Sequence, residues 1–308
     1  MRGAAAGNAP ALALRLLVVC SSASSCSALQ YISSLCHISC ENITAQHSWV
    51  NLAIPKHDNA ATSDAFWTKY GTPSLLPMPE AGVFKRGAGL VPGWEAVLEA
   101  FAANVVLPRM ANRTAIGVFL GDEICCYNTS CWHGQLYPMS AKLRSLLGPR
   151  AILYENECGT PVLFDQLDKI PPDLDWISID GYWGYEPGRP GGATEAHFGR
   201  AFAEKYIYPR MSPSQKLMVV PGTFACSNFS YMPLENSSRS VVAKLQAYFE
   251  WAKEDHRVVG MMPWHINRLP PVAPTGPACD MVLGAVDIPG VVAELRTIAD
   301  WIKTNSTM

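Results

Sequence analysis

Two adjacent carboxylates, Asp122 and Glu123, directly follow the apolar run 116–120 and a single glycine, Gly121. Hydrolysis of a glycosidic bond usually needs one carboxylic acid to protonate the leaving oxygen and a second group to stabilise or attack the sugar cation. A neighbouring like charge favours the protonated form of an acid, and a glycine allows close approach to the backbone. We therefore expect Glu123 to be a general acid/base with Asp122 as an orienting carboxylate, and a solvated acidic loop is the structural alternative.

Three further carboxylates are candidates for the second group. Asp180 follows an apolar run and begins the sequence Asp-Gly-Tyr-Trp, whereas Glu155 and Glu157 flank Asn156. We expect Asp180 to be the strongest of the three, and its alternative role is to brace the loop in which it lies. For Glu155 and Glu157 the favoured alternative is a loop charge beside Cys158, although Glu157 stays among the candidates for substrate binding.

Sugars present flat apolar faces ringed by hydroxyl groups, so their binding sites usually combine aromatic rings with a few fixed polar groups. Aromatic residues of this sequence could supply the rings, and polar residues near position 264 could bind hydroxyl groups. For the tryptophans, packing in the core is the structural alternative. The candidates for substrate binding besides Glu157 are Tyr182, Trp183, Trp264, Trp132, His265 and Asn267.

Other catalytic motifs are absent from the sequence. It contains no Gly-x-Ser-x-Gly elbow, no phosphate-binding Gly-x-x-x-x-Gly-Lys-Ser/Thr loop and no His-x-His or His-Glu-x-x-His pair. The cysteine spacings 36/40 and 125/126/131 lack the paired Cys-x-x-Cys of a zinc site. We therefore expect neither a metal nor a cofactor.

The elements that must position these residues alternate between short apolar runs and segments of helical period, which is typical of a parallel sheet with crossover helices. Apolar residues at three- and four-residue spacing predict helices at 92–110, 140–147, 193–208, 238–256 and 289–303, whereas the helix pattern is weak after the first strand and around 64–70. Eight strands are expected, at 31–38 with the weakest pattern and at 48–54, 74–78, 115–120, 151–154, 176–179, 217–220 and 258–262.

Eight such units predict an α/β protein with a (β/α)8 barrel, irregular at its first strand. The functional face of such a barrel is formed by the residues that follow the strands. These segments are 55–57, 79–80, 121–123, 155–157, 180–183, 221–224 and 263–267, which bring carboxylates and aromatic residues to one face.

Two resemblances point in the same direction. The sequence Leu120-Gly121-Asp122-Glu123-Ile124, followed by Cys131-Trp132, resembles the Gly-Asp-Glu motif of hexosaminidases that use substrate-assisted catalysis. That resemblance implies that Glu123 is the acid and that Asp122 orients an acetamido group, although this chain has one glycine where the family commonly has two. More broadly, an acid after strand four and Trp264 after strand eight are similar to glycoside hydrolases with barrel folds. The nucleophilic Glu that the large retaining clan carries after strand seven is replaced here by Pro-Gly-Thr-Phe.

Composition limits the size of the core and the kinds of partner that this protein can have. A chain of 308 residues with 49% hydrophobic and 16% charged content can bury the core of one barrel. A formal net charge of -2 provides no sequence-wide basic field, which argues against nucleic acid and favours a carbohydrate or glycoconjugate partner. The oligomeric state stays open.

The N-terminus predicts secretion. Arg2 and Arg15 precede a short apolar run, and small residues follow as far as Ala28, so we expect a signal peptide at 1–28 and one barrel domain at 29–308, with no transmembrane segment. Outside this leader eight cysteines remain, an even set compatible with four bridges whose pairing stays open. Glycosylation sequons begin at Asn42, Asn112, Asn128, Asn228, Asn236 and Asn305.

Three hypotheses follow from these observations. The first is a secreted hydrolase of O-glycosidic bonds with Glu123 as general acid/base. The second is a noncatalytic carbohydrate-binding protein that keeps the aromatic cleft. The third is a secreted structural or cell-surface interaction protein. A second carboxylate about 5–10 Å from Glu123 would favour the first.

Overall fold

A computed structural model describes residues 28–36, 48–55, 60–126, 130–165, 167–181, 193–226, 234–264, 266 and 282–306. Eight parallel strands close into a barrel in the order β1-β11-β9-β8-β7-β6-β3-β2, which confirms the predicted fold class. The strand predicted from the weakest pattern is present as β1. The strands are β1 (Tyr31–Cys36), β2 (Leu52–Pro55), β3 (Ser74–Pro77), β6 (Ala115–Asp122), β7 (Ile152–Cys158), β8 (Trp176–Asp180), β9 (Lys216–Val219) and β11 (Val258–Met261).

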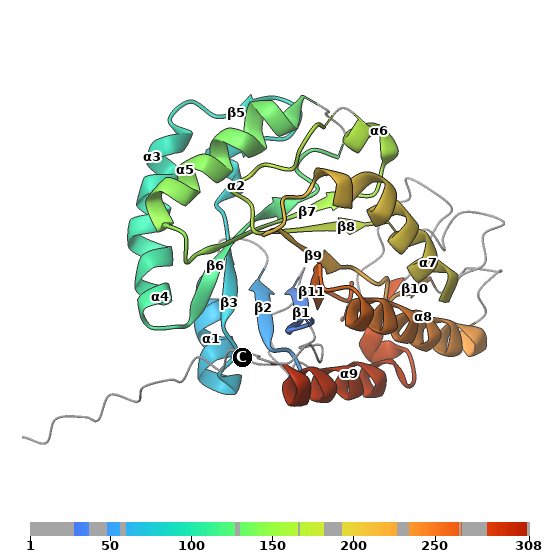
Figure 1. The fold of residues 1–308 in the computed structure, drawn as a ribbon. Coiled ribbons are helices and arrows are strands. Elements are labelled where there is room, and N and C mark those ends of the chain that lie inside the picture. Colours follow the sequence, from blue (N-terminus) through green and yellow to red (C-terminus); the bar gives the residue numbers. More distant parts are fainter. Residues whose placement is uncertain are drawn as a thin grey trace, which may run out of the picture.

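Helices surround the barrel (Figure 1). Several of them contain wider π-helical turns or end in a short 3-10 turn. The α-helices are α1 (Ala60–Tyr70), α2 (Glu80–Val83), α3 (Trp94–Phe101), α4 (Leu107–Ala111), α5 (Tyr137–Leu147), α6 (Pro161–Asp165), α7 (Ala193–Phe202), α8 (Leu234–Glu254) and α9 (Val291–Asn305). The π-helical turns are η3 (Ala102–Val106), η4 (Trp132–Leu136) and η6 (Ala203–Ile207), and the 3-10 turns are η7 (Tyr208–Arg210) and η8 (Ala285–Asp287).

Helix α1 occupies a stretch in which the sequence indicated only a weak helix. Its buried side chains are Phe66 and the small polar residues Thr62 and Ser63. Because only one of the three is apolar, the helix has little apolar periodicity, although Phe66 is completely buried. The ring of helices is therefore more complete than the sequence pattern predicted.

The barrel interior is filled by side chains from alternate positions of its strands. Phe119, Tyr154 and Trp176, from three adjacent strands, belong to this interior cluster, whereas Leu153 belongs to the cluster between barrel and helices. Side chains in a strand alternate between the two faces. Asn156 therefore points into the barrel, and Glu155 points towards the helices.

Strand β7 is longer than predicted. The sequence placed 155–157 in a loop, but they are strand residues, paired in register with β8 as far as Cys158. Glu155 and Glu157 are completely buried, so the expectation of an exposed loop charge beside Cys158 is wrong. A strand with carboxylates at two of its last four positions lacks the apolar run by which strands are recognised in sequence.

In the part of the chain that the structure describes, two small sheets lie outside the barrel. Strand β4 (Phe84–Lys85) pairs with β5 (Gly89–Leu90), and β10 (Ala225–Cys226) pairs with β12 (Val282–Leu283), both antiparallel. The first sheet follows α2, and its residues Phe84 and Lys85 line the same cavity as Pro77 at the end of β3. The site described below depends on this hairpin.

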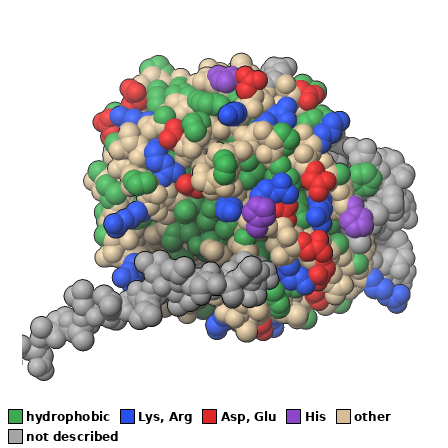
Figure 2. All heavy atoms as spheres, in the orientation of Figure 1, with side chains coloured by type: hydrophobic (Ala, Val, Ile, Leu, Met, Phe, Trp, Pro, Cys, Tyr) green, Lys and Arg blue, Asp and Glu red, His purple; other side chains and the backbone are tan. Residues whose placement is uncertain are grey.

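Acidic and basic side chains are interspersed on the face drawn in Figure 2. None of the helices that the structure describes is long and apolar enough to span a bilayer. The predicted signal peptide lies almost wholly outside the described residues, as do the sequons at Asn42, Asn128 and Asn228. Among the described residues, disulfides join Cys125 to Cys131 and Cys126 to Cys158.

Candidate active site

The end of β6 carries both predicted acids. Phe119 pairs with Tyr154, but the next paired position is Asp122 with Asn156, so β6 has one extra residue and bulges before its last position. Such bulges often redirect a side chain beside an active site. Here the bulge brings Asp122 to the interior face of the barrel, where Asn156 lies.

Glu123 has a left-handed backbone conformation, with φ at 55°. This conformation is unfavourable for residues other than glycine and has to be held by its surroundings. The N–H of Glu123 donates to the backbone oxygen of Asn156 at 2.7 Å. The two disulfides lie directly after it, and Cys126–Cys158 ties this turn to the end of β7. The side chain of Glu123 is half-buried at the mouth of the barrel.

Asn156 connects two carboxylates. Its Nδ2 donates to Asp122 Oδ1 at 2.8 Å and to Asp180 Oδ2 at 3.1 Å. Ser178 Oγ donates to Asn156 Oδ1, and Tyr154 hydroxyl lies 2.6 Å from Ser178 Oγ. Because the amide oxygen is occupied by Ser178, the amide nitrogen must face the carboxylates. The series of hydrogen bonds from Tyr154 through Ser178 to Asn156 therefore fixes the spacing of Asp122 and Asp180.

Asp180 lies at the end of β8, beside the two acids at the end of β6. Burial raises its pKa well above the usual range, and the negative charges of Glu123 and Asp122 raise it further. The side chains of Asp180 and Glu123 interact directly at the ends of β8 and β6. Two of the acids chosen from the sequence thus lie beside each other, and burial favours the protonated form of Asp180.

A second pair of acids lies behind this cluster, on the helix side of β7. Glu157 Oε1 accepts a hydrogen bond from the backbone N–H of Cys125 at 2.8 Å. Burial raises the pKa of Glu157 to about 8 and that of Glu155 well above its usual range. Glu157 therefore supports the turn that carries Glu123. Its side chain is completely buried, so it is not open to a ligand.

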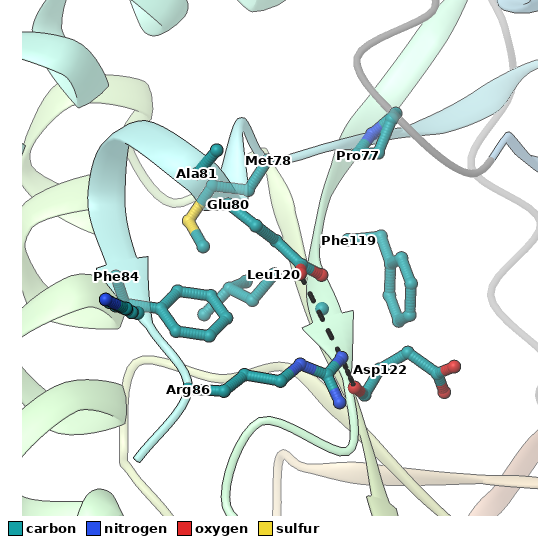
Figure 3. A pocket seen from close by; sticks show the side chains of 11 residues that line it. Pro77, Met78, Glu80, Ala81, Phe84, Arg86, Phe119, Leu120 and Asp122 are labelled. Atoms are coloured by element: carbon teal, nitrogen blue, oxygen red, sulfur yellow. Dashed lines mark hydrogen bonds and ion pairs between the residues drawn. The ribbon is translucent and has the colours of Figure 1, made fainter. Parts of the chain in front are cut away.

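A cavity of about 380 Å³ opens beside Asp122. Figure 3 shows Glu80 pointing into it, with the guanidinium group of Arg86 between Glu80 and Asp122. Arg86 Nη2 donates to the backbone oxygen of Asp122 at 2.6 Å and lies 3.9 Å from Glu80 Oε2. Phe84, Met78 and Phe119 provide apolar walls.

Glu80 and Arg86 were not chosen from the sequence. Glu80 was recognised as following strand three, which was the available signal, but nothing in its neighbourhood distinguished it from a surface acid. Tertiary packing brings Glu80 close to the backbone of β6. If Gly121 carried a Cβ, that atom would lie 3.1 Å from Glu80 Oε1. Gly121 is thus where the backbone of β6 makes room for Glu80.

Trp264 lies after β11 at the mouth, half-buried against the interior cluster, and its ring meets that of Phe224 edge-on at 4.9 Å. Trp132 is 1% exposed and packs on Phe164, so the expectation that it binds a sugar is wrong. Among the described residues, no group of three or more His, Cys, Asp and Glu side chains could hold a metal ion. The other aromatic and polar candidates lie outside the described residues: Tyr182, Trp183, His265 and Asn267.

No protein-family model and no curated protein matches the sequence. Solved structures do match the fold. A β-glucuronidase from an uncultured Clostridium sp. superposes with a TM-score of 0.59 at 11% identity, covering 89% of this chain and 50% of its own. A Ruminococcus gnavus β-glucuronidase gives 0.62 at 11%, covering 88% and 49%. A GH2 β-galacturonidase from Eisenbergiella tayi gives 0.58 at 10%, covering 87% and 51%.

The chain spans about half the length of these structures. At such low identity the likeness shows the fold alone, and the activities named for those proteins do not transfer to this chain. The chain is therefore built on a (β/α)8 barrel of the kind found in glycoside hydrolases.

Proposed function

We propose that this protein is a hydrolase of O-glycosidic bonds whose acid is Glu123, with Asp180 beside it. One observation carries the proposal: the Asn156 amide binds both Asp122 and Asp180 at the ends of the barrel strands, and Glu123 lies beside Asp180. Active sites of barrel enzymes lie at this end of the strands. A raised pKa favours the protonated form of a carboxyl group, the form that can give a proton to a leaving oxygen.

In this proposal each acid has its own role. Glu123 delivers the proton, because it is half-buried and lies at the mouth, while Asp180 keeps that proton in the site. Asp122 is oriented by Asn156 and would orient the substrate, which is the role implied by the Gly-Asp-Glu resemblance. Glu80, across the cavity from Asp122, is the candidate for the second carboxylate.

A specific observation favours a second candidate function, a noncatalytic carbohydrate-binding protein. Glycosidase carboxylate pairs usually stand about 5–10 Å apart, whereas the side chains of Glu123 and Asp180 interact directly with each other. This pair therefore cannot flank a sugar from opposite sides. The hydrolase proposal depends on Glu80 or on a group of the substrate for that role.

We also propose that the protein enters the secretory pathway. Two disulfides are typical of an oxidising compartment. The sequon residues Asn112 and Asn305, which the structure describes, are exposed, as glycosylation requires. Expression in a secreting host with and without glycosidase treatment would show a mobility shift if these sites are occupied.

The decisive experiment measures hydrolysis of a panel of chromogenic glycosides by the parent protein, Glu123→Gln and Asp180→Asn. The panel includes glucuronides and galacturonides, suggested by the structural neighbours, and N-acetylhexosaminides, implied by the resemblance. The rate should fall about 10²–10⁴-fold in Glu123→Gln. The control Glu99→Gln alters an exposed acid paired with Lys142, remote from the mouth, and should leave the rate unchanged. Glycan binding without hydrolysis in every variant would replace the hydrolase proposal with the binding protein.

A further inference from the structure

A buried ion pair lies beside the segment that follows the seventh barrel strand, β9, outside the acid cluster. Glu195 of α7 and Lys244 of α8 are 0% and 2% exposed, and Lys244 Nζ lies 2.6 Å from Glu195 Oε2 (Figure 1 shows the two helices). Tyr248, which is also buried, interacts with Glu195. Removing two charges from water costs more free energy than such a pair usually returns, so a buried pair is weak evidence for a purely stabilising role.

Both charged groups hold the same peptide. Lys244 Nζ donates to the backbone oxygen of Gly222 at 2.9 Å, and Glu195 Oε1 accepts from the backbone N–H of Gly222 at 3.2 Å. Gly222 belongs to the segment that replaces the strand-seven acid of the retaining clan. The two charged side chains thus hold both the backbone N–H and the backbone oxygen of Gly222. The segment around Gly222 is too short to form a sheet of its own.

That segment in turn holds Trp264. Gly222 forms a parallel bridge with Trp264, the N–H of Thr223 donates to Trp264 O at 2.6 Å, and the N–H of Trp264 donates to Pro221 O at 3.0 Å. The ring of Phe224 meets the indole edge-on. The position of the indole at the barrel mouth therefore depends on the segment that the ion pair clamps.

We infer that Glu195 and Lys244 are positioning residues that hold Trp264 as the surface on which the apolar face of a sugar ring stacks. Sugar binding by Trp264 rests on the proposed function, whereas the placement of the indole does not. The pair acts through Gly222 and does not touch the substrate. Its loss should therefore weaken binding more than it slows the chemical step.

The test compares three variants. Lys244→Met leaves Glu195 as an unpaired buried charge and should lower Tm by about 10 °C. The double variant Glu195→Met/Lys244→Met removes both charges and should recover most of that loss, because large apolar side chains replace the pair. Arg200→Gln is the matched control: Arg200 of α7 pairs with Glu254 of α8 at 3.0 Å, so it breaks an ion pair between the same helices at the surface.

Two readouts separate positioning from stability. In protein labelled with 5-fluorotryptophan, the ¹⁹F resonance of Trp264, assigned with Trp264→Phe, should shift or broaden in the double variant and stay in place in Arg200→Gln. With the chromogenic glycoside that the parent hydrolyses, KM should rise about three- to tenfold in the double variant, with a smaller change in kcat.

Each outcome has a definite meaning. An unchanged Trp264 resonance in the folded double variant overturns the inference, and so does an unchanged KM when the glycoside is hydrolysed. If the parent hydrolyses nothing, the proposed function fails, and the ¹⁹F spectrum alone still decides whether the ion pair places the indole.

Discussion

The carboxylate of Glu157 accepts a hydrogen bond from the backbone N–H of Cys125 at 2.8 Å and has no exposed surface. Cys125 lies two residues after Glu123, whose left-handed backbone needs support. Glu155, on the same face of β7, is equally buried. The turn that carries the proposed acid is thus anchored on Glu157, one of two buried carboxyl groups whose raised pKa favours the protonated form. This makes the stability of the protein sensitive to pH.

Stability should fall as the pH rises from about 5 to 8. The pKa of Glu157 is about 8 in the folded protein against 4.5 in the unfolded chain, so in this interval the folded state holds a proton that the unfolded state has lost. The free energy of unfolding then decreases by on the order of 1 kcal/mol per pH unit. Below the unfolded pKa the contribution is fully present. Denaturant titration at pH 5, 6, 7 and 8 measures the slope.

Glu157→Gln provides the control for that slope. Glutamine keeps an acceptor for the Cys125 N–H but does not titrate, so its stability should depend less steeply on pH than that of the parent. Glu99→Gln, at an exposed site, should reproduce the parent's slope. Equal slopes in the parent and in Glu157→Gln would contradict the raised pKa.

Gly121→Ala should damage the site. An added Cβ would lie 2.7 Å from Ile124 Cδ1 and 3.1 Å from Glu80 Oε1, so both side chains must move. Overpacking of this kind costs about 1–3 kcal/mol of stability, and displacement of the neighbouring Asp122 should lower the rate of glycoside hydrolysis. At Gly134, in η4, an added Cβ meets nothing within 4 Å. Gly134→Ala should therefore preserve activity and stabilise by about 0.5–1 kcal/mol; similar behaviour of the two variants in thermal unfolding would refute the predicted contact.

Asn156→Asp should separate the acids that Asn156 now connects. The substitution preserves shape but replaces the donor to Asp122 and Asp180 with another negative charge. We expect kcat/KM to fall about 10²-fold or more, with an altered acid limb of the pH–rate profile. Asn104→Asp introduces the same charge on the exposed surface of η3 and should change neither quantity. An unaltered profile in Asn156→Asp would exclude this amide from the organisation of the acids.

Glu80→Gln tests the second carboxylate. Glu80 faces the cavity beside Asp122 and is 41% exposed, so its neutral analogue should fold normally. If Glu80 stabilises or attacks the sugar cation, kcat should fall by about 10²-fold or more while KM changes little. Steady-state kinetics on the glycoside found in the panel measures both. Activity within about threefold of the parent would assign the second role to a group of the substrate.

The sequence by itself determined the repeated alternation of strands and helices, and thereby a barrel with its functional face after the strands. Asp122, Glu123, Asp180 and Trp264 could be chosen as candidates from the sequence because each follows an apolar run, and apolar runs are local features. The sequence did not predict that Glu157 is buried, that Trp132 packs in the core or that helix α1 is well formed. Each depends on what packs against the element from elsewhere in the chain.

Only the tertiary structure decided which acids meet. Strand order placed β3 beside β6, which brought Glu80 and Arg86 to Asp122 across more than thirty residues of sequence. The bulge in β6 turned Asp122 towards Asn156, and the parallel register of β7 with β8 placed Asp180 on the other side of the same amide. The physical reason is that the pKa and the orientation of a carboxylate are set by its neighbours in space, and closure of the barrel chooses those neighbours.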